Sequence, residues 1–249
     1  MRRHQFLRTF GVVAAFAMAV LVGTLIISPR GQASGQPNSG NDEASEIQQG
    51  FAIAPVPLNL DGKNRALVGL GSYIVNAQGD CNGCHSAGPA TEFVSLHNPY
   101  FRSPFFIPPM KVNPATYLGG GRDFGPFPGP APNNQLEHLF SRNLTPDKTG
   151  LPEGGHTFAE FLQIIRTGVD FDHVHPNCSA TVTTNCLLPP FNGDVLQVMP
   201  WPTYHNMTER DLGAIYQYLS CIPHAEPCNG SCPPSYPNSK DCPNPAPPR

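Results

Sequence analysis

The chain carries two cysteines separated by two residues, with a histidine directly after the second: Cys81-Asn82-Gly83-Cys84-His85. This spacing is the attachment pattern of a c-type haem. Both sulfurs must reach the two vinyl groups of one porphyrin, and the adjoining imidazole then stands over the iron as its proximal ligand. The motif therefore constrains the fold, because the chain has to wrap a large and mostly apolar group beside these residues.

A targeting segment is indicated over residues 1–30. Three arginines near the start precede an apolar run from Phe10 to Ile27, and Ser28, Pro29 and Arg30 follow it. This run is at the lower limit for a membrane span and longer than many signal-peptide cores. A cleaved signal and an uncleaved N-terminal anchor are both compatible with it. Each predicts export to the periplasm or to the outer face of the cytoplasmic membrane.

The charge is divided unevenly along the chain. Residues 1–30 hold four arginines and no acidic residue, so the remainder carries about −7 although the whole chain carries −3. An acidic, exported body argues against binding to nucleic acid. It favours docking to a basic patch on a redox protein partner.

Six further cysteines agree with an oxidising compartment: Cys178, Cys186, Cys221, Cys228, Cys232 and Cys242. Six can form three disulfide bonds in fifteen connectivities, and the first two flank a short loop across which they can pair. The other four could instead form a thiolate zinc site, which export disfavours. No second CxxCH occurs, so the sequence predicts one haem.

Three helices are predicted from periodicity and capping. The first runs over residues 64–77 into the CxxCH motif. The second begins at Thr157, where Glu160 completes a capping box, and ends at Gly168. The third begins at Thr208 and ends near residue 221, with acidic residues in its first turn.

The remaining segments are predicted from composition. Residues 31–60 have the composition of a linker followed by an extended lead-in. Residues 86–135 are rich in Pro, Gly and Phe, which predicts a long irregular region that wraps an apolar cofactor. Residues 61–222 are expected to form the haem domain, and residues 223–249 a Pro- and Cys-rich tail.

An electron-transfer haem needs a second axial ligand, and Met199 is the strongest candidate. It lies in a proline-stiffened loop, Val198-Met199-Pro200-Trp201-Pro202. A thioether opposite histidine raises the haem potential and closes the site to oxygen chemistry. Met207 is the runner-up and Met110 a third choice.

The other histidines are expected to be solvent-exposed rather than ligands, and the pair His173-x-His175 is weak evidence for a metal. They are His97, His138, His156, His173, His175, His205 and His224.

Four separated segments carry a resemblance to a family. They are Gly71-x-Tyr73, the stretch from Asn143 to Gly150, His156-Thr157-Phe158 with Arg166-Thr167-Gly168, and the stretch from Met199 to Leu219. In this order they resemble class I c-type cytochromes, and most of all the cytochrome subunits of membrane-bound alcohol and gluconate dehydrogenases. The resemblance covers roughly residues 64–222.

The resemblance implies an all-α, class I cytochrome c-like fold around one haem. Cys81 and Cys84 would form the thioether links, His85 would be the proximal ligand and Met199 the distal one. Trp201 and the turn at Asn143 would lie near the haem edge or its propionates. Two features depart from the family: the long 86–135 region, and the additional cysteines of the loop and tail. Those relatives often carry several CxxCH motifs, so membership in a dehydrogenase complex stays open.

The sequence thus predicts a non-enzymatic electron carrier that works between an exported dehydrogenase and a respiratory acceptor. A haem enzyme such as a peroxidase, or a gas sensor, is the alternative and would need an open or labile iron site. A thiol–disulfide protein using Cys81 and Cys84 is a third reading, which His85 and the Met199 motif disfavour.

Overall fold

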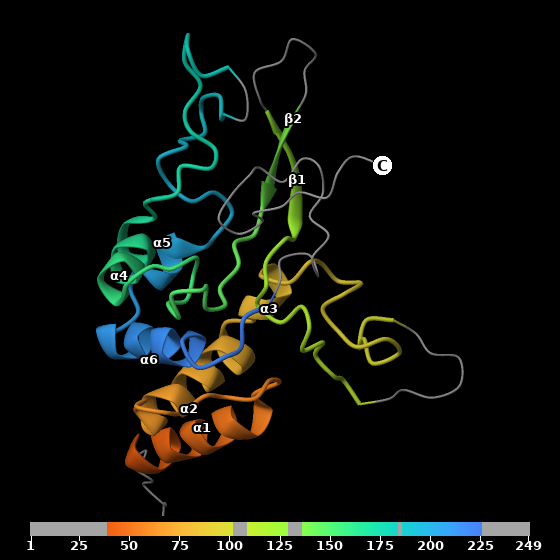
Figure 1. Ribbon diagram of the computed structural model, residues 1–249, viewed down its shortest axis with the longest axis vertical. Coiled ribbons are helices and arrows are strands. Elements are labelled where there is room, and N and C mark those ends of the chain that lie inside the picture. Colours follow the sequence, from red (N-terminus) through yellow and green to blue (C-terminus); the bar gives the residue numbers. More distant parts are fainter. Residues whose placement is uncertain (1–38, 102–108, 129–135, 184–185, 226–249) are drawn as a thin grey trace, which may run out of the picture. The chain divides into compact units, whose positions relative to one another are not determined.

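The computed structural model describes residues 39–101, 109–128, 136–183 and 186–225 (Figure 1). Its helices are α1 (Ser39–Ile53), α2 (Arg65–Tyr73), the π-helix η1 (Ile74–Gln78), α3 (Cys81–Cys84), α4 (Phe158–Thr167), α5 (Trp201–Tyr204) and α6 (Glu209–Leu219). Two strands, β1 (Asp123–Pro128) and β2 (Leu136–Phe140), form an antiparallel sheet.

The N-terminal targeting segment and the tail after residue 225 lie outside the described residues, so what the sequence predicts for them stays a prediction. Within the described ranges, no helix combines the length and apolar character needed to cross a membrane.

The three helices predicted from capping and periodicity are confirmed. The side chain of Asn64 caps α2 by accepting from the amide of Ala66 at 3.1 Å. Thr157 and Glu160 form the expected capping box at the start of α4. Thr208 accepts from the amide of Asp211 at 3.1 Å and begins α6. These caps satisfy backbone N–H groups that a helix start leaves open.

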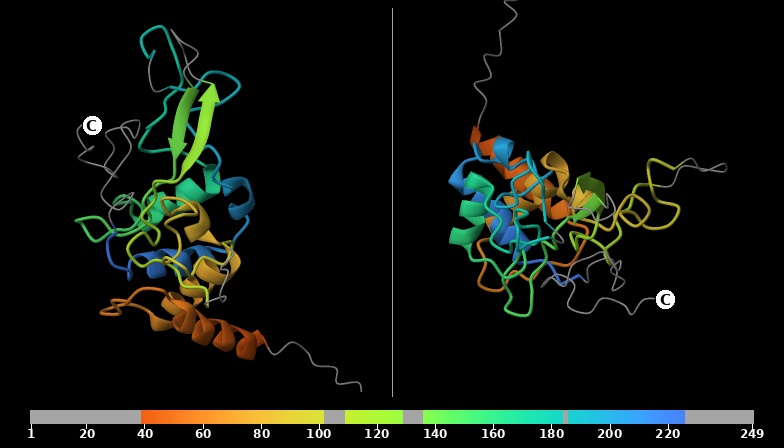
Figure 2. Two further views of the ribbon diagram at one scale, coloured as in Figure 1. Left: turned by 90° about the vertical axis from the view of Figure 1, so that its right-hand side faces the viewer. Right: turned by 90° about the horizontal axis from the view of Figure 1, so that it is seen from above.

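Helix α2 packs between α1 and α6 (Figures 1 and 2). A Cβ on Gly71 would overlap the backbone carbonyl of Ala214, so glycine is what allows α2 and α6 to approach this closely. Val68 and Val75 from α2 and η1 are buried with Tyr218 and Leu219 from α6. This core holds the helix that leads into the CxxCH motif.

Helix α1 lies where the composition predicted a linker, so that part of the prediction is wrong. Ile47 of α1 packs on the cluster around Leu70, and Phe51 packs on the cluster around Val68. The Arg65 guanidinium lies over the Phe51 ring at 5.2 Å. A polar sequence becomes helical here because one narrow apolar face is buried against α2.

The prediction of an all-α fold is also wrong, since β1 lies in the region expected to be irregular and pairs with β2, which directly follows that region. Asp123 faces Phe140, and Pro126 faces His138, with an irregularity between these two pairs. Prolines argued against strands in this segment. In a two-stranded sheet, however, both strands are edges, and a proline there need not interrupt a ladder bond. The fold is therefore a mixture of helices and a small sheet.

The long segment before β1 is tied to the core by a hydroxyl network. Tyr117 is 1% exposed, and its hydroxyl donates to Oδ1 of Asn76 at 2.6 Å and lies 2.8 Å from the hydroxyl of Tyr218. Asn76 belongs to η1, and short π-helical segments are frequent at functional sites. The network thus fixes the helix end from which the CxxCH motif begins.

Candidate functional site

Cys81 and Cys84 stand at the two ends of α3, which is a single helical turn. The chain bends before it at Asp80, whose backbone is left-handed with a φ of 44°. The amide of His85 donates to the carbonyl of Cys81 at 2.8 Å and closes the turn. Because residues three apart in a helix are neighbours on its surface, the two thiols lie on the same side of the turn.

The imidazole of His85 is oriented by the backbone of a distant segment. His85 is 9% exposed, and its Nδ1 lies 2.8 Å from the carbonyl oxygen of Arg142. Nδ1–H is therefore the donor, and Nε2 keeps its lone pair. Burial lowers the pKa of His85, which favours this neutral form. A ring N–H bound to a backbone carbonyl is the usual support of a metal-ligating histidine.

A cavity of about 1070 Å³, part of it open to solvent, lies beside this turn. Cys84 and His85 line it from one segment, and Met199 lines it from a segment far along the chain. Much of its wall is aliphatic: Leu139, Leu144, Ile164, Leu187, Val195 and Leu196. The cavity brings three of the predicted site residues together within the apolar surroundings typical of a cofactor site.

Of the three methionines considered from the sequence, Met199 is the one that lines the cavity. Met207 packs on two hydrophobic clusters around α6, one of which Met199 also contacts, and Met110 is 64% exposed. Val198, directly before Met199, has a φ of 65°. This conformation is costly for a β-branched residue, and such strain tends to persist at functional positions.

The other predicted site residues support the cavity from outside its described lining. Cys81 shares the turn with Cys84. Nε1–H of Trp201 donates to the carbonyl of Leu196 at 3.2 Å, which holds the Met199 loop. Asn143 is 5% exposed and donates to the carbonyl of Ala225 at 2.8 Å. The turn that follows Arg142 is thereby attached to the end of the described chain.

A cluster of charged residues forms one side of the cavity, and the sequence reasoning missed it. The Arg142 guanidinium binds Asp170 at 3.0 Å and Asp172 at 3.1 Å. Nε2 of His156 lies 3.8 Å from Oδ2 of Asp172, and its Nδ1 lies 3.9 Å from Oε2 of Glu160. The neighbouring carboxylate of Asp172 raises the pKa of His156, although burial opposes it. The sequence feature that could have indicated this cluster is the position of Arg142 directly before the Asn143 motif.

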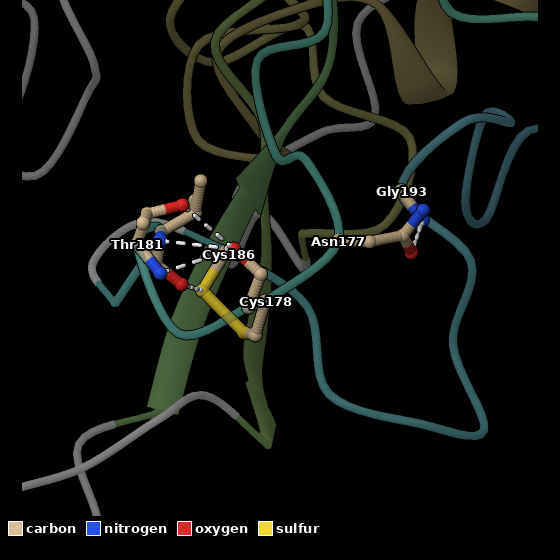
Figure 3. Close-up of a disulfide and its surroundings, with 7 residues drawn as sticks. Asn177, Cys178, Thr181, Cys186 and Gly193 are labelled. Carbon is tan, nitrogen blue, oxygen red and sulfur yellow. Dashed lines mark hydrogen bonds between the residues drawn. A yellow bond between two sulfur atoms is a disulfide. The ribbon is translucent and has the colours of Figure 1, made fainter.

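Residues 169–183 and 186–196, called here the disulfide lobe, supply many of the residues that line the cavity. The predicted local disulfide Cys178–Cys186 is confirmed (Figure 3). The amide of Gly193 donates to Oδ1 of Asn177 at 2.8 Å, as Figure 3 also shows. These contacts fold the lobe back on itself, and His175 is among its residues that line the cavity.

Two histidines differ from their expected exposure, since His156 and His175 are each only 9% exposed. His173 is exposed, as predicted.

Across the described residues, no group of three or more His, Cys, Asp or Glu side chains is arranged to hold a metal ion. Cys228, Cys232 and Cys242 lie outside these residues, so their bonding stays open. Cys221 is buried and has no disulfide partner among the described residues.

No protein-family model matches the sequence, and no solved structure matches it. Two curated proteins do: the cytochrome c subunits of alcohol dehydrogenase (quinone) from Gluconacetobacter polyoxogenes and Komagataeibacter europaeus. Each is 27% identical over 177 residues, which is 71% of this chain and 25% of the relative.

The chain resembles c-type cytochromes. The match spans about a quarter of the length of these curated cytochrome relatives. It supports the resemblance to c-type cytochromes that the sequence motifs indicate, and it does not extend to the particular ligands or partners.

Proposed function

We propose that this protein is an exported electron carrier with one covalently attached haem c. The observation that carries the proposal is the cavity in which the CxxCH residues Cys84 and His85 meet Met199. A proximal imidazole and a distal thioether from two distant segments are the ligands of an electron-transfer haem.

The residues of the cavity fit this group. Cys81 and Cys84 supply two thiols for attachment, and His85 offers a neutral Nε2 because its Nδ1–H is bound to the Arg142 carbonyl. The aliphatic wall suits the apolar face of a porphyrin. The haem would supply an iron centre that takes up and releases one electron.

The chain itself positions the proposed ligands. The Arg142 carbonyl orients the imidazole of His85, the Trp201 N–H holds the loop before Met199, and the aliphatic side chains would shield the bound haem from water. Met199 as sixth ligand would leave no open position for a substrate and would raise the reduction potential. This closed arrangement favours electron transfer over a peroxidase-like enzyme or a gas sensor.

The thiol–disulfide alternative is disfavoured by the environment of Cys81. Burial raises the pKa of its thiol to about 12, with Asp80 and Cys84 adding to the effect. A thiolate is the nucleophile in disulfide exchange, and cysteines that serve this role have a lowered pKa.

The partners and the compartment are proposed from the sequence and from the names of the relatives. The curated relatives are subunits of a quinone-dependent alcohol dehydrogenase, which supports a dehydrogenase as electron donor and a respiratory component as acceptor. The apolar segment within residues 1–30 supports a periplasmic location or a position on the outer face of the cytoplasmic membrane. The electron-carrying domain would comprise residues 61–222.

The ligand set is tested by optical spectroscopy of two methionine variants. Met199→Ala should lose the long-wavelength charge-transfer band of a methionine-ligated ferric haem, and its reduction potential should fall. Met207→Ala is the matched control and should keep both. An unchanged spectrum in Met199→Ala would show that another residue is the ligand.

Covalent attachment is tested on a denaturing gel stained for haem. The wild-type band should carry haem, and a Cys81→Ala/Cys84→Ala double variant should not. A wild-type protein without bound haem, or with a high-spin haem in both oxidation states, would contradict the proposed electron carrier.

A further inference from the structure

Nδ1 of His175 is a buried polar atom of a residue in the cavity wall, and it has no hydrogen-bond partner within the described chain. The residue is 9% exposed, and burial lowers the pKa of its imidazole to about 4. A buried polar group without a partner is costly, and native structures contain few of them. The cavity wall therefore contains a neutral histidine whose Nδ1 has no partner among the described residues.

The backbone at His175 is fixed by contacts within the disulfide lobe, to which this residue belongs. The amide of Leu187 donates to the carbonyl of Pro176 at 2.9 Å, next to the Cys178–Cys186 bond. Gly193 packs so closely on the His175 carbonyl that a Cβ at that position would overlap it. The position of the imidazole is thus built into the lobe rather than left to a loose loop.

The surroundings of His175 are charged on one side and apolar on the other. Arg142 and Asp170 act electrostatically on its ring, and Glu153, His156 and Asp172 line the same cavity. Arg142 is bound to the carboxylates of Asp170 and Asp172. His175 is therefore a neutral imidazole that lies near an ionic cluster and lines the same cavity as the aliphatic side chains.

A haem matches this division, because it has an apolar ring and two propionate carboxylates on one edge. We propose that His175 donates its Nδ1–H to a propionate of the bound haem. This inference rests on the proposed function, and it assigns His175 as a cofactor-positioning residue that does not bind the iron.

The hydrogen bond has a measurable effect on the redox chemistry. A donor to the ionised carboxylate lowers the pKa of that carboxylate. An ionised propionate favours the oxidised iron, so the reduction potential falls as the pH rises through the propionate pKa. Removal of the donor should move this inflection to higher pH.

The test is the reduction potential measured by spectroelectrochemistry between pH 4 and pH 9. His175→Leu removes the donor, and its inflection should lie about one pH unit above that of the wild type. His175→Asn keeps an N–H close to the position of Nδ1 and should restore most of the wild-type inflection. His173→Asn is the matched control, because His173 is exposed and its left-handed backbone suits asparagine.

Equal inflections in His175→Leu and His173→Asn would overturn the inference. If His175→Leu does not fold, His175→Gln replaces it, since its amide reaches the position of Nε2 instead. Equal inflections in the Asn and Gln variants would then overturn the inference. If the wild type carries no covalent haem or shows no methionine charge-transfer band, the proposed function is refuted instead. Failure of the inference and failure of the proposed function can therefore be told apart.

Discussion

Asp80 and Val198 both have left-handed backbones, and each directly precedes a residue of the proposed site. Asparagine, aspartate and histidine tolerate this conformation, whereas valine does not. Val198 is 49% exposed, so its side chain gains little from burial that would offset the strain. The strain is instead balanced by the contacts that fix Met199 and Trp201 after it.

His156 gives the protein a pH-dependent contribution to stability. Its pKa is raised in the folded state, first by Asp172 and also by Glu153 and Glu160, while burial opposes the shift. The protonated form therefore favours folding. This contribution is complete below the unfolded pKa of about 6.5 and is lost as the pH rises through the folded pKa.

The prediction is that the free energy of unfolding of the wild type falls between about pH 6 and pH 8, relative to His156→Gln. Chemical denaturation at several pH values measures it. Parallel pH profiles of the two proteins would contradict the assignment.

At the residue level, short-range patterns predicted well. The spacing of Cys81, Cys84 and His85 fixes one helical turn, so the motif alone indicated how these side chains are arranged. The presence of Arg142 and His175 in the cavity wall could not be predicted, because contacts between segments distant in sequence bring them there. A histidine in a polar stretch is exposed unless such a contact buries it.

At the level of elements, local capping determined which helices could be predicted. Thr157 with Glu160, and Thr208 with Asp211, mark the starts of α4 and α6 in the sequence itself. Helix α1 and strands β1 and β2 have weak local signals, because their stability comes from packing and cross-strand pairing. Tertiary contacts override propensity in such segments.

The contact between α2 and α6 leads to a prediction on two glycines. Gly71→Ala should lower the free energy of unfolding by about 1–3 kcal/mol, because the new Cβ overlaps the backbone of Ala214. Gly213→Ala is the matched control, since its Cβ would meet the Phe158 ring at an ordinary 3.6 Å. It should be neutral or stabilising by up to about 1 kcal/mol. Thermal and denaturant unfolding of both variants would show the contrast, and equal stabilities would contradict it.

At the level of the whole molecule, segments distant in sequence build the cavity. Among them, the CxxCH turn provides Cys84 and His85, the segment after β2 provides Arg142 and Leu144, and the disulfide lobe leads into Met199. The sequence indicated these three segments through the CxxCH, Asn143 and Met199 motifs. It did not indicate how the lobe closes the wall, because its composition carries no periodic signal.

The disulfide of the lobe should contribute to global stability. A Cys178→Ser/Cys186→Ser variant is expected to lose about 2–3 kcal/mol in its free energy of unfolding, since the bond restricts the unfolded chain. Ala180→Ser lies in the same loop and is exposed, so it should change stability by less than about 0.5 kcal/mol. Denaturant titration under non-reducing conditions measures both, and a double variant as stable as the wild type would refute the expectation.

The base of the lobe is closed by backbone pairing. The amide of Leu196 donates to the carbonyl of Gly168 at 2.7 Å, and that of Asp170 donates to the carbonyl of Asp194 at 3.0 Å. The two ends of the lobe therefore lie side by side, as in a hairpin, and loops that leave and return at one point tolerate changes in length. We therefore expect the lobe to accept insertions or deletions between these paired ends, because the pairing itself keeps the segment that leads into Met199 in place.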